Sequence, residues 1–150
     1  MSEASLQQLT TFWIDSNLYG IDVQGVQEVT KSLPLTPVPL APTSIAGLLN
    51  LRGQIATAIG LRQLFAMPPA ADSAKESLVI CRQDGCLIAL VVDEIGDVIE
   101  VSPKDFEEAP QTMPESVRAY SRGVYKLEKN VLTLVDVGCV TEKFNPGKSV

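Results

Sequence analysis

Arg52 stands at the centre of a mostly apolar stretch, "SIAGLLNLRGQIATAIGLRQLF", residues 44–65. A guanidinium presents a planar fork of donors that suits one bidentate carboxylate partner. Gly47 and Gly53 flank Arg52, and because glycine has no side chain, a partner's backbone could approach closely there. The pattern indicates a contact site. Two simpler interpretations stay open: a solvent-exposed arginine at a strand end, and a buried arginine paired with a carboxylate purely for packing.

Cys81 and Cys86 are a second pair of residues that could do chemistry. They flank Asp84-Gly85, the expected turn of a hairpin. With a two-residue turn they would be diagonal neighbours on one face, and with a four-residue loop they would lie directly opposite each other. A thiol-based redox or metal-responsive module is one interpretation, and small buried cysteines are the other. With only the distant Cys139 to add and no histidine, the metal pattern is weak.

Catalysis has no positive sign in the sequence. The absence of histidine excludes a Ser–His or Cys–His pair, a histidine-ligated metal and a phosphohistidine relay. Neither a GxxxxGK[ST] loop nor a GxGxxG fingerprint is present to hold phosphates. We therefore expect a protein that is not an enzyme and that uses no cofactor or metal; an enzyme with lysine or carboxylate catalysis alone is the disfavoured alternative.

Composition limits which partners the protein can bind and in which compartment it is expected. The net charge of −6 argues against binding to nucleic acid, which needs clustered lysine and arginine. The N-terminus does not resemble a signal peptide, and no apolar run approaches the ~18–20 residues of a membrane span. We expect a folded cytoplasmic protein that does not insert into the membrane and whose cysteines are reduced.

The elements expected to position these residues are mostly β-strands. Pro-rich residues 32–42 are expected to be a loop, residues 43–49 a short turn or helix, and residues 61–65 a helical turn. Residues 17–20 are expected to be a turn, 66–77 a surface loop, and 101–116 a loop with a little helix. The expected strands cover residues 9–15, 21–29, 54–59, both arms of a hairpin at 78–93, and 131–136.

Two segments of the chain recur in the same order. A shift of 72 residues lays residues 23–29 on 95–101, with Glu28 on Glu100, and a shift of 76 lays residues 47–64 on 123–140. The repeat predicts two small β units of ~70 residues, each marginal alone, that share a hydrophobic seam. A groove is expected where they meet.

The blocks "IDVQGVQEV", "IAGLLNLRGQIATAIGLRQLF", "LIALVVDEIGDVIEVSPKDFEEAP" and "GVYKLEKNVLTLVDV" resemble the CheW family of chemotaxis coupling proteins. The resemblance covers residues 9–142. It implies two five-stranded SH3-like β-barrels that share a core and that could exchange strands, with flexible ends at 1–8 and 143–150. It also implies a scaffold that links the cytoplasmic tips of chemoreceptors to the histidine kinase CheA. One departure is Gly60, where the family usually has an acidic residue, whereas the second repeat keeps Asp136.

The resemblance also implies the site. The positions matched by Glu28 and Arg52 are expected to lie together at the partner-binding surface, as a partly exposed ion pair that orients the arginine. A helical receptor tip would lay its apolar stripe in an apolar groove, although each apolar candidate could instead be core. Asp93, Glu94 and Asp97 are expected to be solvated. The expected partner-binding residues are Glu28, Arg52, Gly47, Asn50, Gly53, Val26, Val29, Leu49 and Val98, with Leu48 and Val92 as further groove candidates. A CheW-like adaptor of a non-flagellar chemosensory pathway would have the same pattern.

Overall fold

The computed structural model describes residues 6–70 and 75–144. Residues 1–5 and 145–150, most of the two ends expected to be flexible, lie outside the described residues. The strands are β1 (Gln7–Ile14), β2 (Asn17–Asp22), β3 (Val26–Lys31), β4 (Ile45–Leu51), β5 (Gln54–Gly60), β6 (Ser77–Gln83), β7 (Cys86–Val92), β8 (Glu94–Val101), β9 (Phe106–Glu107), β10 (Ser121–Lys126) and β11 (Val131–Val135). The α-helices are α1 (Leu61–Leu64), α2 (Glu115–Arg118) and α3 (Val137–Phe144), and 3₁₀ turns cover Val23–Gly25 and Pro103–Asp105.

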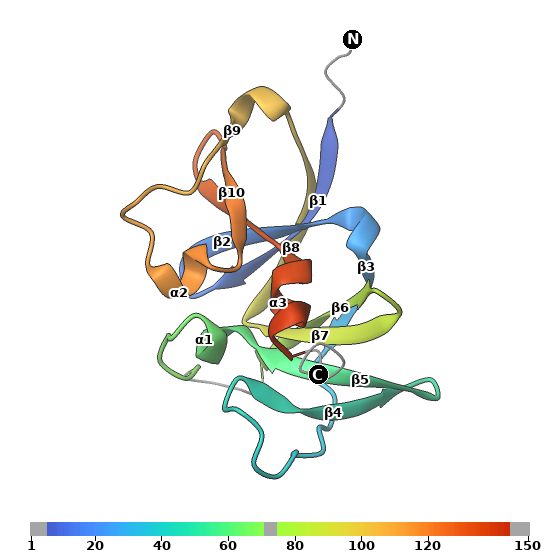
Figure 1. The fold of residues 1–150 in the computed structure, drawn as a ribbon. Helices are drawn as coiled ribbons and strands as arrows, with labels where there is room; N and C mark the ends of the chain where they lie inside the picture. Colours follow the sequence, from blue (N-terminus) through green and yellow to red (C-terminus); the bar gives the residue numbers. More distant parts are fainter. Residues whose placement is uncertain (1–5, 71–74, 145–150) are drawn as a thin grey trace.

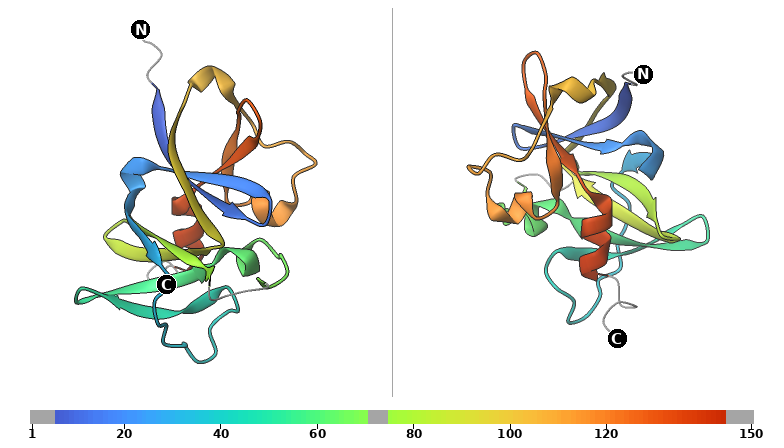
Figure 2. Two further views of the ribbon diagram at one scale, coloured as in Figure 1. Left: turned by 180° about the vertical axis from the view of Figure 1, so that it is seen from behind. Right: turned by 45° about the horizontal axis from the view of Figure 1, so that its top comes forward.

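The strands form two sheets that occupy the upper and lower halves of Figure 1. The six-stranded sheet has the order β8-β1-β2-β11-β10-β9, and the five-stranded sheet has the order β3-β6-β7-β5-β4. The view from behind in Figure 2 shows β8 running from the lower half of the molecule to the upper half. The prediction of a mostly β fold with a few short helices is confirmed, and the two sheets are consistent with the expected pair of SH3-like barrels.

The two sheets share one pairing order. From β8 to β10 the neighbouring strands pair antiparallel, antiparallel, parallel and antiparallel, and the same series runs from β3 to β4. This order matches β3 with β8, and β4–β5 with β10–β11, which are the segments aligned by the two sequence shifts. The pairing order therefore supports a division of residues 9–142 into two related units, which stays a proposal.

Three hydrophobic clusters form the core. One cluster lies within the five-stranded sheet, around Leu49 and Ile80, and one lies within the six-stranded sheet, around Leu9 and Leu132. The largest draws residues from both sheets, including Phe12 and Leu90. Strand β6 shows why its sequence is continuously apolar: Leu78 and Ile80 face the cluster of their own sheet, whereas Val79 and Cys81 face the shared cluster. The two sheets thus share a core.

Several sequence expectations about elements were wrong. Residues 43–49 were expected to be a turn or helix but mostly form β4, which hydrogen bonds to β5. The turn expected at 17–20 lies earlier, at Asp15-Ser16, and β2 already begins at Asn17. The expected strand at 21–29 is interrupted by the 3₁₀ turn Val23–Gly25. Helix α3 was not predicted, although Asp136 is a favoured residue before a helix, because "VGCV" continues the apolar pattern of β11. The longest described helix has eight residues, so none of the described helices could cross a membrane.

Gly60 leaves the start of α1 without a side-chain cap. It occupies the position before the helix, and no side-chain hydrogen bond caps the first turn. At the matching position before α3, Asp136 Oδ1 accepts a hydrogen bond of 3.2 Å from the Cys139 N–H. The first turn of α1 thus lacks the side-chain cap that Asp136 supplies to α3.

We expect Gly60→Asp to raise the free energy of unfolding by about 0.5–1 kcal/mol, from a restored cap and a less flexible unfolded chain. Gly60 has φ −79°, which aspartate adopts without strain, and the new Cβ would displace only the flexible end of the Gln63 side chain. Urea unfolding of Gly60→Asp beside Gly60→Ala measures the effect, because alanine stiffens the chain but cannot cap. Equal stability of the two variants would mean that the cap contributes nothing.

Candidate partner-binding surface

Arg52 lies in the tight turn between β4 and β5. Arg52 and Gly53 both have positive φ, 54° and 89°, as a two-residue hairpin turn of this kind requires. Asn50 Oδ1 accepts a hydrogen bond of 2.8 Å from the Gly53 N–H and fixes the turn. The Arg52 side chain is 72% exposed. The apolar stretch therefore carries an arginine at its centre because the chain reverses direction there in solvent.

Glu28 and Arg52 form the bidentate ion pair expected from the sequence. Nη1 of Arg52 lies 2.5 Å from Oε1 of Glu28, and Nη2 lies 3.1 Å from Oε2. The hydrogen bonds from Glu28 raise the pKa of Arg52, so the guanidinium is always charged. Glu28 belongs to β3 and Arg52 follows β4, and these strands are the two edges of the five-stranded sheet. The ion pair therefore connects the edges of the sheet across its open side.

Gly47 allows a second link, which joins β4 to Thr36 in the segment that follows β3. Backbone hydrogen bonds of 2.8 Å join Thr36 and Leu48 in both directions. Gly47 has φ 150°, and a Cβ on it would lie 2.8 Å from the Thr36 carbonyl oxygen. The close approach expected at Gly47 is thus made by the chain itself. Gly53 has open space around it, so a partner could approach there.

Arg82 extends the polar surface beside the ion pair, and the sequence analysis did not single it out. Its Nε donates to Gln27 Oε1 at 3.1 Å, and its Nη2 donates to Gln54 Oε1 at 3.0 Å. Gln27 neighbours Glu28 on β3, and Gln54 follows the Arg52 turn. The only sequence signal was a charged residue near the tip of an otherwise apolar hairpin. We call Gln27, Glu28, Arg52, Gln54 and Arg82 the polar edge cluster.

The apolar candidates fall into three groups. Leu49 and Val92 are buried in the core and Leu48 is half-buried, so Leu49 and Val92 are excluded from a surface. Val26 is half-buried against the shared core. Val29 is exposed and lines a groove of about 370 Å³ between β3 and β8, whose other lining residues are Thr30, Lys31, Lys75, Ser77, Glu94 and Ile95. We call it the β3–β8 groove.

Val98 is exposed at 55% on β8 but does not line the β3–β8 groove. It pairs with Thr10 across the six-stranded sheet, whereas Val26 pairs with Cys81 in the other sheet. The two valines aligned by the repeat therefore occupy different environments, one exposed on its strand and one against the core.

The expectation that Asp93 is solvated was wrong. Its carboxylate accepts hydrogen bonds from Arg62, at 2.9 Å to Nε and 2.6 Å to Nη2, and Arg62 is only 8% exposed. Burial alone would raise the pKa of Asp93, but the hydrogen bonds from Arg62 and from the Asp15 N–H outweigh it and hold the pKa below its usual value. Arg62 had been interpreted only as part of a helical turn.

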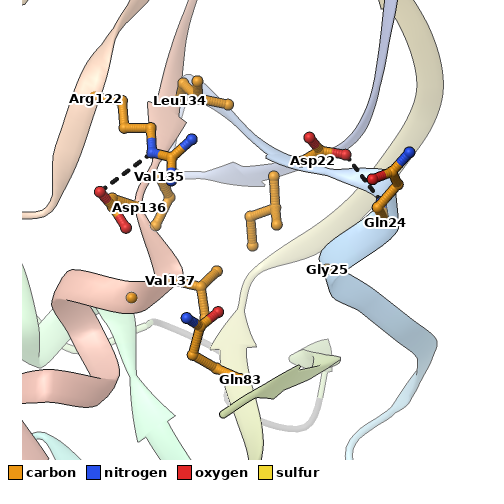
Figure 3. A pocket seen from close by; sticks show the side chains of 11 residues that line it. Asp22, Gln24, Gly25, Gln83, Arg122, Leu134, Val135, Asp136 and Val137 are labelled. Carbon is orange, nitrogen blue, oxygen red and sulfur yellow. Dashed lines mark hydrogen bonds and ion pairs between the residues drawn. The ribbon is translucent and has the colours of Figure 1, made fainter.

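A smaller polar pocket lies between the two sheets, on another side of the seam. Figure 3 shows Arg122 and Asp136 on one side of it and Asp22 and Gln24 on the other, with Gln83 below. Its volume is about 290 Å³. Arg122 Nε lies 3.2 Å from Asp136 Oδ2, so the two charges form an ion pair. The pocket lining contains no cysteine, serine, threonine or lysine that could act as a nucleophile. In residues 6–70 and 75–144 no cluster of three metal-ligating side chains is found.

The cysteines give no support to a redox or metal-responsive module. The turn has two residues, Gln83 pairs with Cys86, and Cys81 pairs with Ile88, so the two cysteines are diagonal. All three described cysteines are free thiols. Burial raises the pKa of the Cys81 thiol to about 12, which leaves it uncharged and unreactive at neutral pH.

Comparison with known proteins decides the family. The family model described as "CheW-like domain" matches residues 8–143. The chain belongs to the CheW family. Among its CheW relatives, the chemotaxis protein CheW of Treponema pallidum is 34% identical over 87% of this chain and 79% of its own length. The chemotaxis protein CheW of Rhizobium meliloti is 25% identical over 89% and 86%. The crystal structure of the scaffolding protein CheW from Thermoanaerobacter tengcongensis superimposes with a TM-score of 0.79 at 27% identity, covering 87% of this chain and 89% of that one.

Proposed function

We propose that this CheW-family protein is a non-catalytic scaffold that couples chemoreceptors to the histidine kinase CheA. The observation that carries the proposal is the family match along residues 8–143, on a fold of two sheets with a shared core. The partners are the helical cytoplasmic tips of the receptors and the CheW-like regulatory domain of the kinase. The protein is cytoplasmic and joins receptor arrays at the inner membrane.

The proposed contact surface has two parts. The polar edge cluster supplies the exposed, fully charged and geometrically fixed Arg52, held by Glu28 and by the Asn50–Gly53 turn. Charges at such a rim favour one partner and one orientation more than they add raw affinity. The β3–β8 groove supplies exposed Val29 beside lysine and glutamate side chains. An amphipathic receptor helix would place its apolar stripe on Val29 and its polar flanks on those charges.

Other candidate residues support the proposed contact surface from within the fold or lie at its edge. Gly47 supports the surface by letting Thr36 approach β4, and Val26, the first residue of β3, packs against the shared core. Val98 is exposed on β8 and would enlarge the surface of a partner that reaches past the groove. The same surface would serve an adaptor of flagellar chemotaxis or of another chemosensory output.

A reconstituted signalling complex tests the proposal. The purified protein, the CheA kinase of the same organism and a chemoreceptor in nanodiscs are combined singly and together, and kinase autophosphorylation is followed. We expect a strong rise only when all three components are present, because a scaffold acts by bringing the other two together. Stimulation of the kinase to the same level without receptor would contradict coupling, and an unchanged rate with all three would reject the function.

A further inference from the structure

Arg62 joins the two sheets at the point where the chain passes from one to the other. It belongs to α1, which directly follows β5 of the five-stranded sheet, and its guanidinium contacts the carboxylates of Asp93 and Asp15. Asp93 is the single residue between β7 of the five-stranded sheet and β8 of the six-stranded sheet. Asp15 lies in the β1–β2 turn of the six-stranded sheet. One buried guanidinium therefore holds both units.

Each of the three guanidinium nitrogens of Arg62 donates a hydrogen bond. Nε and Nη2 contact the two oxygens of Asp93, Nη2 also donates to Asp15 Oδ1, and Nη1 donates to the Pro68 carbonyl oxygen at 2.8 Å. Asp93 Oδ2 accepts a further hydrogen bond of 2.7 Å from the Asp15 N–H, and the Asp93 N–H donates to the Trp13 carbonyl oxygen at 3.1 Å. Such a network tolerates only one geometry, because any rotation between the units breaks several charged hydrogen bonds.

The β3–β8 groove lies next to the Arg62 network along the chain. Glu94 and Ile95, which line the groove, directly follow Asp93. A hollow of about 280 Å³ beside Arg62, lined also by Trp13 and Glu76, shares Lys75 and Glu94 with the groove. One wall of the groove is β3 of the five-stranded sheet, and the other is the start of β8 of the six-stranded sheet. The angle between the sheets therefore sets the width of the groove.

We propose that Arg62 is a positioning residue for partner binding: with Asp93 and Asp15 it fixes the angle between the two sheets and so holds the β3–β8 groove at the width that accepts a receptor helix. This inference rests on the proposed function for the identity of the ligand. Arg62 does not line the groove, so it would act on the receptor helix only through the positions of the two sheets. This role is distinct from a contribution to stability.

Asp15→Gly is the variant that tests the inference with least damage to the fold. Asp15 has φ 55°, which glycine adopts freely, and it is 49% exposed. The substitution removes the carboxylate that the six-stranded sheet offers to Arg62, while Asp93 still compensates the buried charge. Asp84→Gly is the matched control. Asp84 has φ 52° at the turn of β6–β7, the hairpin that corresponds to β1–β2 in the pairing order, and no ion pair with the described residues is found for it.

Two measurements are made on each variant. The first is the affinity for a soluble fragment of a chemoreceptor tip from the same organism. The second is the distance distribution between spin labels on Gln27→Cys of β3 and Asp97→Cys of β8, measured by pulsed electron paramagnetic resonance. Cys86 and Cys139 are replaced by serine, whereas Cys81 is kept because its buried thiol does not react.

We expect one narrow distance distribution in the parent protein and in Asp84→Gly. In Asp15→Gly we expect a broadened or displaced distribution and an affinity about tenfold lower, the size of effect that a coupled positioning residue exerts. Distances and affinity in Asp15→Gly equal to those of Asp84→Gly would overturn the inference and leave Arg62 a stabilising residue only. If the parent protein fails to bind the receptor fragment, the proposed function fails, and the distance measurement still decides whether Arg62 positions the sheets.

Discussion

Asp93→Ala is expected to lower the free energy of unfolding by about 3 kcal/mol. Removing one partner of a buried ion pair costs about 3–5 kcal/mol when the remaining charge stays buried without compensation. In Asp93→Ala the Arg62 guanidinium keeps only its contacts with Asp15 and the Pro68 carbonyl oxygen. Asp93 is 22% exposed, so water reaches part of the site and the expected cost is at the lower end. Urea unfolding monitored by fluorescence of Trp13, which lies beside the cluster, gives the value directly.

Asp97→Ala is the matched control, since Asp97 is exposed on β8 and no ion pair with the described residues is found for it. We expect a change within about 0.5 kcal/mol there. The double variant Asp93→Ala/Arg62→Met separates two causes. If the cost comes from a stranded guanidinium, the double variant is more stable than Asp93→Ala alone. A double variant that is less stable than Asp93→Ala would instead mean that Arg62 contributes through its bonds to Asp15 and Pro68.

The same pair predicts a pH dependence. The pKa of Asp93 is lower in the folded protein than its usual value near 4, so its stabilising contribution is complete above that value. As the pH falls through the folded pKa, the carboxylate takes up a proton and the contribution is lost. Wild-type protein should therefore lose stability below about pH 4 more steeply than Asp93→Ala. Parallel curves for the two proteins between pH 5 and pH 2 would contradict the assignment.

The elements that sequence predicted well are those with strong local signals. The hairpin of β6 and β7 follows from two apolar arms around Asp84-Gly85, and the structure has this two-residue turn. Strand β4 was missed because Gly47 and the neighbouring apolar residues show no alternation. Its two faces meet different surroundings: Leu49 and Leu51 enter the core, whereas Ala46 and Asn50 are exposed. The glycine is there for the approach of Thr36, a contact between residues that the sequence could not place together.

The candidate site also contains residues that the sequence predicted and residues that it did not. The Glu28–Arg52 pair was predictable because a charged residue in an apolar stretch needs an explanation and the family resemblance supplied its partner. Arg62 gave no such signal, since an arginine in a short helical turn is ordinarily solvated. Its partners Asp15 and Asp93 lie 47 and 31 residues away along the chain. Local sequence does not reveal such contacts, because they depend on how the two sheets pack.

Arg52→Ala is expected to weaken binding to receptor or kinase about 30-fold while the protein melts close to wild type. Truncation of a fixed arginine at an interface commonly has an effect of this size, whereas exposed ion pairs add little to folding. Arg52→Lys should restore binding only in part, because an ammonium cannot make the two parallel bonds to Glu28. Binding is measured by titration calorimetry against the kinase regulatory domain and against the receptor fragment, with thermal melts of each variant.

Glu28→Ala completes a double-mutant cycle that asks whether the two residues act as a unit. If Glu28 orients Arg52, the single variants lose similar affinity and the double variant loses less than the sum. Arg118→Ala is the control, because Arg118 also pairs with a glutamate, Glu115, on the surface but lies outside the proposed contact. Additive losses would mean that Glu28 and Arg52 touch the partner independently. If Arg52→Ala unfolds the protein, the ion pair that joins the edges of the five-stranded sheet is structural. If the variant melts and binds as the wild type does, the Arg52 guanidinium is only solvated and the partner binds elsewhere on the seam.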